Sequence, residues 1–377
     1  QATIATGGGP LDWLELDMLL DAMVADDRSN ASEVFADYPM RDSWRAMQAM
    51  MEEKLGFPLE PELFSNMLFA AHLGCERESE GAELGNHLVA TLRDREADGL
   101  YHFFASMRFA CDVDCTAMAA RARLATRDID LSTPAGAAAL GRITSAILRS
   151  AAVCDVPAER NLTHGKMNGP LHRHVFKVYL DDHAVQGPEC DRGLKNNPVV
   201  TANALYPVLF ELKCGLRDPD EIVRLKEFVE GSEAPRTGEA RVVDIVSANV
   251  CYASRYLCAG VWRLGCRYYP SPDAFLCFYG ENVREFPQLF GAFHATRALR
   301  EAIEERRRAE KSEPATDPEA SLNAAFRAIA ATSIGMDASP ELDWLVDRQS
   351  DSGEWTGPDC IYSFGSSTAI PIHFRSN

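Results

Sequence analysis

The sequence contains no run of about 20 consecutive apolar residues, the length that a membrane-spanning helix requires. Residues 1–16 (QATIATGGGPLDWLEL) lack the basic and apolar segments of an export signal. The eleven cysteines are an odd number, so they cannot all pair within one chain. We therefore expect a cytoplasmic protein without a transmembrane segment, and peripheral contact with a membrane stays compatible with this expectation.

Positive charge is also scarce, with 38 Lys and Arg against 56 Asp and Glu and a net charge of −18. Such a balance argues against an exposed phosphate-binding face and predicts no nucleic-acid partner. The sequence has no glycine-rich dinucleotide fingerprint, no P-loop and no nucleophile elbow. Common classes of nucleotide-dependent enzymes and serine hydrolases are thereby disfavoured.

Metal-binding patterns are incomplete. The HRH stretch with His172 and His174, and the pair Cys111 and Cys115, each lack the second half of a zinc site. The LDDHA stretch at 180–184 does not complete the D-D-x-x-D motif that binds magnesium and diphosphate in class I terpene synthases. We expect no metal and no other cofactor, and Mg²⁺ enters only if the substrate carries a diphosphate.

Helical periodicity dominates a chain of 377 residues that is 46% apolar and 25% charged. No linker divides it, so we expect one domain over 1–377. A charged connector is expected at 304–320. Helices are expected at 10–27, 42–56, 62–74, 134–152, 201–215, 218–230, 245–260, 287–309 and 317–333.

A repeat places a hydroxyl residue, followed by Ala, at the start of four helices. Its members are Thr116, Thr201, Ser247 and Thr368, whose hydroxyls can satisfy the free N–H groups of a first turn. A glycine turn precedes three of them, at Gly99, Gly187 and Gly353. Recurring helical units predict stacked hairpins, and about twelve helices close most naturally into an all-α toroid whose inner helices point their N-termini into a central cavity.

Two motifs carry a resemblance to a known family. Gln349, Gly353 and Trp355 fit the Q-x-x-x-G-x-W repeat of squalene–hopene and oxidosqualene cyclases. Residues 112–117 (DVDCTA) resemble the D-x-D-D-T-A motif of class II terpene cyclases, with Cys115 as in the D-C-T-A motif of oxidosqualene cyclases. The resemblance covers about 90–377. Residues 1–90 carry no recognised motif, and we expect them to supply helices that close or cover the ring.

The resemblance implies an (α/α)6 barrel and a protonation-initiated cyclisation of a small-molecule isoprenoid. Asp114 matches the general acid and Asp112 matches the first Asp of the motif. The family also implies that Cys115 hydrogen-bonds the acid. Whether the protonated group is an epoxide or an alkene stays open, as does a meroterpenoid substrate.

Elementary electrostatics fits such an acid. A low-dielectric cavity raises the pKa of a carboxyl group, and a second carboxylate nearby raises it further. Cys115 and Thr116 can orient the proton through hydrogen bonds. Aromatic faces stabilise a carbocation without quenching it. The candidate substrate-binding residues are Tyr101, Phe103, Phe104, Asn203, Asn249, Tyr269, Phe278 and Phe364.

Two other functions stay open. One is a non-catalytic toroid that binds prenyl groups, which only an activity measurement separates from a cyclase. The other is an inverting (α/α)6 glycoside hydrolase, which needs two carboxylates about 6.5–9.5 Å apart across an open groove. Asp112 and Asp114 are nearly adjacent and form a poor pair for that reaction. Helix capping alone is the simplest alternative reading of these two residues.

Overall fold

The computed structural model of the chain describes the molecule from residue 63 onward, with gaps. The expected helices at 10–27 and 42–56, and Phe104, Gly187, Gly353, Trp355 and Thr368, lie outside the described residues. The described ranges are 63–74, 80–92, 96, 99–103, 110–163, 166–180, 193–227, 234–266, 268–269, 271–312, 320–349, 351, 359–365 and 371–376.

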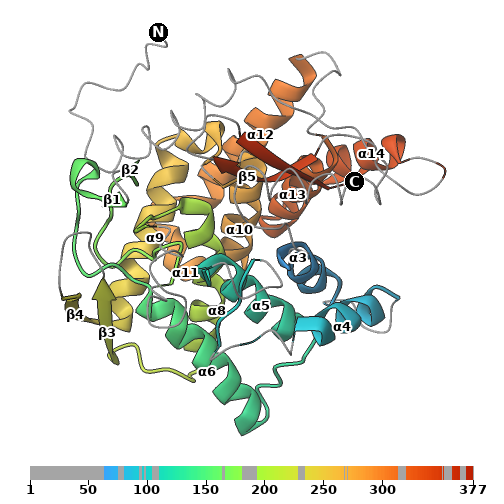
Figure 1. Ribbon diagram of the computed structural model, residues 1–377. Coiled ribbons are helices and arrows are strands. Elements are labelled where there is room, and N and C mark those ends of the chain that lie inside the picture. Colours follow the sequence, from blue (N-terminus) through green and yellow to red (C-terminus); the bar gives the residue numbers. More distant parts are fainter. Residues whose placement is uncertain are drawn as a thin grey trace.

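The described part of the chain is mostly helical (Figure 1), which confirms the expected predominance of α-helices. None of its helices combines the length and apolar character that crossing a bilayer requires. The α-helices are α3 (Phe64–Leu73), α4 (Glu80–Leu92), α5 (Val113–Ala125), α6 (Pro134–Arg149), α8 (Pro198–Lys213), α9 (Val242–Cys258), α10 (Pro272–Glu285), α11 (Pro287–Phe290), α12 (Ala295–Ser312), α13 (Ala320–Ser333) and α14 (Ser339–Arg348). Short 3-10 turns are η2 (Ala158–Arg160), η4 (Val261–Leu264) and η5 (Gly291–Phe293).

The strands form three antiparallel pairs: β1 (Leu162–Thr163) with β2 (Lys166–Met167), β3 (Ile222–Glu227) with β4 (Arg236–Arg241), and β5 (Asp359–Gly365) with β6 (Pro371–Ser376). The predicted helix at 218–230 is therefore wrong. Val223, Leu225 and Glu227 are buried while the residues between them are exposed, which is the two-residue period of a strand.

Five helices form a series in which each packs against the next: α3, α5, α8, α10 and α13. A second set of helices packs against this series, with α4 against α3, α6 against α5 and α8, α9 against α8, α12 against α10, and α14 against α13. Figure 1 shows α8 near the middle of the molecule, between α5 and α9. The core follows the series, since α8 and α10 are buried along most of their length.

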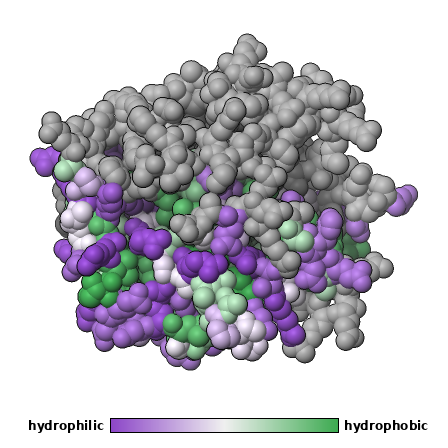
Figure 2. Space-filling view, turned by 60° about the horizontal axis from the view of Figure 1, so that its bottom comes forward, coloured by the Kyte–Doolittle hydropathy of each residue, from purple (hydrophilic) through white to green (hydrophobic). Residues whose placement is uncertain are grey.

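Close helix contact depends on small residues. A Cβ added at Gly280 in α10 would lie 3.4 Å from the Cα of Ala330 in α13 and 3.2 Å from Leu299 Cδ2 in α12. The turn at Gly99 has φ = +80°, so the predicted glycine turn is confirmed there. Among the residues that Figure 2 colours by hydropathy, polar ones are the more prominent, with apolar residues interspersed among them.

Helices do begin at three of the four aligned stretches, but the hydroxyl residues are not the N-caps of these helices. Asp112 caps α5 by accepting from the backbone N–H of Cys115 at 2.6 Å. Asn197 caps α8 by accepting from the N–H groups of Val199 (3.0 Å) and Val200 (3.2 Å). Thr116, Thr201 and Ser247 lie inside the helices, because the cap belongs to the residue with extended backbone that precedes each helix.

Two substitutions at the start of α8 separate these roles. Asn197→Ala is expected to lower the free energy of unfolding by about 1 kcal/mol, because two N–H groups lose their acceptor. Thr201→Val is expected to leave it unchanged or raise it, because the buried Thr201 hydroxyl has no hydrogen-bond partner among the described residues. Urea denaturation measures both, and a larger loss in Thr201→Val than in Asn197→Ala would contradict the assignment.

The expected connector at 304–320 is wrong in its first half, because α12 continues to Ser312. Two of its arginines bind buried carboxylates rather than solvent: Arg306 pairs with Asp273 at 3.0 Å and Arg307 pairs with Glu341 at 2.6 Å. Arg327 contacts both carboxylates, at 3.1 and 3.2 Å. These pairs hold α12, α13 and α14 on α10, which explains why a strongly charged stretch is helical here.

Candidate active site

The carboxyl group of Asp114 lies inside the protein, at the first turn of α5, and the residue is 6% exposed. Asn203 of α8 donates its amide to Asp114 Oδ1 at 2.8 Å and to the Asp114 carbonyl at 3.1 Å. Tyr269, which precedes α10, donates its hydroxyl to Asp114 Oδ2. Because α5, α8 and α10 are successive members of the buried series, the fold brings three distant segments onto one carboxyl group.

A buried polar chain continues from Asn203 toward α10. Arg121 of α5 donates to Asn203 Oδ1 at 3.2 Å and to the carboxylate of Glu281. Its guanidinium lies over the rings of Tyr206, at 4.6 Å, and Phe278, at 5.4 Å. The continuous chain is Tyr269, Asp114, Asn203, Arg121 and Glu281.

Burial raises the pKa of both motif carboxyls. The pKa of Asp114 is raised to about 6 by desolvation, against hydrogen bonds from Tyr269 and Asn203 and the positive charge of Arg121, which lower it. The pKa of Asp112 is raised to about 7 by desolvation and by the negative charge on Asp114, against hydrogen bonds from the α5 backbone and from the Cys115 side chain, which lower it. The pair therefore retains protons close to neutral pH, where exposed aspartates are ionised.

The two remaining motif residues join α5 to its surroundings. Cys115 is 1% exposed and belongs to the hydrophobic core. Its backbone N–H donates to the side chain of Asp112, the N-cap of α5. Thr116 accepts a hydrogen bond from the N–H of Tyr101 at 3.2 Å, which ties the segment after the Gly99 turn to the helix start. Both therefore help to position the segment that carries Asp114.

Of the predicted aromatic residues, Tyr269 contacts the acid directly, and Phe278 lies beside Tyr269. Their rings meet edge to face at 6.2 Å, and Tyr269 also meets Phe64 of α3 at 6.4 Å. The ring of Phe278 also meets the ring of Phe326 of α13 edge to face, with 6.1 Å between the ring centroids. The surroundings of Tyr269 are thus aromatic on two sides, in addition to its bond to Asp114.

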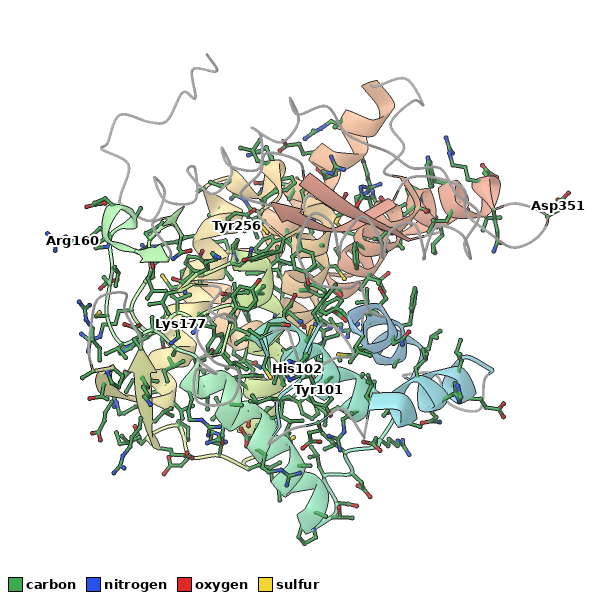
Figure 3. The ribbon with its side chains drawn as sticks, in the orientation of Figure 1. Tyr101, His102, Arg160, Lys177, Tyr256 and Asp351 are labelled. Carbon is green, nitrogen blue, oxygen red and sulfur yellow. The ribbon has the colours of Figure 1, made fainter. Side chains whose placement is uncertain are left out.

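Tyr101 and Phe103 belong to the segment beside α5, where Figure 3 labels Tyr101 and His102. The Tyr101 hydroxyl bonds with Arg123, at 3.0 Å, and with Glu96, at 3.4 Å, so its polar end serves that ion pair rather than Asp114. Phe103 is 5% exposed, and its carbonyl accepts from the N–H of residue 63 at 2.8 Å. Both residues are in the core cluster.

For Asn249 and Phe364, two other predicted substrate-binding residues, the structure gives no contact with Asp114 among the described residues. The Asn249 side chain accepts from Phe176 N–H at 2.9 Å and donates to the carbonyls of His174, at 2.9 Å, and Ile245, at 2.8 Å. Its amide is thus engaged with the backbone of α9 and of segment 166–180. Phe364 lies in β5, and its side chain is outside the described part.

Sequence reasoning missed Arg121, Tyr206 and Glu281. A signal was present for two of them, because Arg121 and Glu281 are charged residues within largely apolar helical stretches, AMAARARLA and FLCFYGENV. A charge at a core position needs a partner. The identity of that partner depends on the packing of α5 against α8 and α10, which the sequence does not specify.

Comparisons with known proteins add little here. No protein-family model matches the chain, and no curated protein matches it. A crystal structure of a protein from Actinoplanes is similar at 13% identity with a TM-score of 0.46, covering 80% of this chain and 75% of that one. We base no conclusion about fold or function on this similarity.

Proposed function

We propose that the protein is a class II-type terpene cyclase in which Asp114 protonates an isoprenoid. The observation that carries this proposal is a buried carboxyl group whose pKa is raised to about 6 and which bonds to Tyr269, whose ring in turn meets the rings of Phe278 and Phe64. Protonation of an alkene or epoxide requires such a carboxyl, which is neutral before the reaction and a strong donor during it.

We further propose that the helices form an α/α toroid. The support is the order of contacts, with α3, α5, α8, α10 and α13 as inner helices and α4, α6, α9, α12 and α14 as their outer partners. These make five consecutive hairpins. A sixth would come from the helices predicted at 10–27 and 42–56, in line with the expectation that residues 1–90 close or cover the ring.

The proposed first step transfers one proton. The O–H bond of Asp114 breaks, and the proton goes to the electron pair of a substrate double bond, which leaves a carbocation. In an epoxide the proton goes to a lone pair of the oxygen, and a ring C–O bond then breaks to give a hydroxyl group and a carbocation. The resulting Asp114 carboxylate accepts from Tyr269 and Asn203, with the charge of Arg121 behind them. These groups stabilise the charge that develops on the acid, which makes Asp114 a stronger donor than burial alone would allow.

The glycoside hydrolase alternative fits this site less well. That reaction needs one carboxylate ionised as a base on the opposite face of the substrate from the acid. Asp112 and Asp114 both have raised pKa values and belong to the same helix start. A prenyl-binding protein without catalysis would need neither a raised pKa nor donors on both oxygens of Asp114.

The direct test is a substrate screen. The protein would be incubated with prenyl chains of several lengths, each as the alkene, the terminal epoxide and the diphosphate, and the products analysed by mass spectrometry. The proposal predicts a cyclic product, either isomeric with its substrate or a hydrate of it. Binding of these compounds with no turnover would instead favour the non-catalytic alternative.

Tyr269 tests how the acid is tuned. Its hydrogen bond lowers the pKa of Asp114, so Tyr269→Phe is expected to raise that pKa above about 6. The rate requires protonated Asp114, and its decline with rising pH should therefore move to higher pH in the variant. The matched control is Tyr256→Phe, because the Tyr256 hydroxyl donates to the Gly265 carbonyl at 2.8 Å. A midpoint that stays in place, or moves to lower pH, would contradict this role.

A further inference from the structure

Three potential metal ligands of different chemical types, one from α3 and two from α10, lie close together. His72 lies in the last turn of α3. Cys277 and Glu281 lie on α10, four positions apart and therefore on one face of the helix. One donor atom from each of the three residues lies within 4.8 Å of the other two. The site contains a ring nitrogen, a sulfur and a carboxylate oxygen.

The histidine is in the state that a ligand requires. Its Nε2 is buried and has no hydrogen-bond partner among the described residues, and its Nδ1 lies 4.0 Å from Glu281 Oε1, beyond hydrogen-bond reach. An orphaned buried nitrogen is rare in folded proteins and needs a reason. A metal ion would satisfy it by binding the ring through Nε2, whereas Nδ1 is the nitrogen that lies 4.0 Å from Glu281 Oε1.

Glu281 divides its two oxygens between two neighbours. Oε2 accepts from Arg121, and Oε1 faces His72. An arginine that holds the far oxygen of a carboxylate orients it in the way that outer-shell partners orient metal ligands. The ion pair with Arg121 therefore leaves Oε1 available for an ion, and Arg121 remains on the opposite side of the carboxylate.

From this geometry we propose that His72, Cys277 and Glu281 bind one Zn²⁺ ion. Nitrogen, sulfur and oxygen donors suit zinc, and three protein ligands leave a fourth position of its tetrahedron for water. Zinc bonds of about 2.0–2.3 Å require the donors to approach to about 3.5 Å from one another, a contraction of roughly an ångström. Binding releases the thiol proton of Cys277, so two anionic ligands balance the charge of the ion.

The bound ion would fasten α3 to α10, beside the buried polar chain that ends at Glu281. Cys277 is 0% and Glu281 is 5% exposed, whereas the side chain of His72 is 29% exposed and leaves a path for entry. This inference does not depend on the proposed cyclase activity. It departs from the sequence-based expectation of no metal, because His72 and the Cys277/Glu281 pair are far apart in the chain.

Titration of the full chain with metal tests the site. Chelator-treated protein would receive Zn²⁺ while its melting temperature is recorded, and Co²⁺ while its absorption spectrum is recorded. We expect one equivalent to bind, the melting temperature to rise with Zn²⁺ concentration, and a thiolate-to-cobalt charge-transfer band to form. None of these readouts uses catalysis, so failure here and failure of the proposed function are distinguishable.

Variants identify the ligands. His72→Gln and Cys277→Ser are each expected to weaken Zn²⁺ binding by at least about 100-fold, and Cys277→Ser should also abolish the cobalt band. The matched controls are His87→Gln and Cys214→Ser, at exposed positions. His72 is partly exposed, so His72→Gln should keep the melting temperature of the metal-free protein. The inference is overturned if no ion binds, or if binding in His72→Gln and Cys277→Ser equals that of the controls.

Discussion

Asp114→Asn is expected to lower the rate of cyclisation by about 10²–10⁴-fold, the usual contribution of a positioned general acid. Asn has nearly the shape of Asp and retains an oxygen that can accept from Asn203, which donates to Asp114 Oδ1 at 2.8 Å. It carries no acidic proton for the substrate. The loss should therefore appear in the rate, while the helical fold stays intact.

The measurement is the rate of product formation under single-turnover conditions, with circular dichroism to verify folding. Asp347→Asn, at an exposed position of α14, serves as the matched control and should keep the parent rate. If Asp114→Asn forms product as fast as the parent, another group donates the proton and the assignment of the general acid is wrong.

Asp112→Asn is expected to stabilise the protein at pH 8 and to leave its stability at pH 4 nearly unchanged. The pKa of Asp112 is raised from 3.8 to about 7 in the folded protein. The folded state therefore binds this proton more tightly than the unfolded state does, and the associated stability is lost as the pH rises from about 4 to about 7. Asn cannot ionise, and it caps a helix as well as Asp does.

The pKa difference converts to a gain of at most about 4 kcal/mol at pH 8. The other groups that act on Asp112 are Asp114, whose charge raises its pKa, and the N–H groups of the helix start and the Cys115 side chain, whose hydrogen bonds lower it. Urea denaturation at pH 4, 6 and 8 would measure the difference between variant and parent. An equal difference at all three pH values would mean that Asp112 titrates normally and is only a cap.

The sequence was informative about local structure. The aligned hydroxyl stretches located the starts of α5, α8 and α9 approximately, because helix starts depend on residues within one or two turns. The helices expected from 201 and 245 begin three residues earlier, at Pro198 and Val242. The aligned stretches misassigned the caps, since Asp112 and Asn197 come before the hydroxyls. The hairpin of β3 and β4 was missed because 218–230 was interpreted by its apolar content rather than by its alternation.

The site itself was predictable only in part. Asp114 and Asp112 were found from their motif, and Asn203 from the register of the repeat. Their mutual arrangement depends on long-range packing, as does the donation from Tyr269 and the placement of Arg121 between Tyr206 and Phe278. No local pattern specifies which helices become neighbours, so Arg121 and Glu281 could only be recognised once α5 and α10 were placed.

The chemical character of Asp114 arises from two opposing influences. Desolvation favours the neutral acid, while Tyr269, Asn203 and Arg121 favour the anion. If desolvation acted alone, the carboxyl group would hold its proton too firmly to donate it. If these three groups acted alone, the carboxyl group would be ionised at pH 7. Together they produce a group that is partly protonated near neutral pH and whose conjugate base is already solvated by fixed donors.

The most direct test is an infrared titration of the carboxyl groups of the substrate-free protein, comparing the parent with Asp114→Asn. The account predicts a protonated-carboxyl band that titrates with a midpoint near pH 6 in the parent and disappears from the difference spectrum when Asp114 is replaced. A parent whose Asp114 is already fully ionised at pH 5 would contradict the account, because no proton would then be held where the substrate needs it.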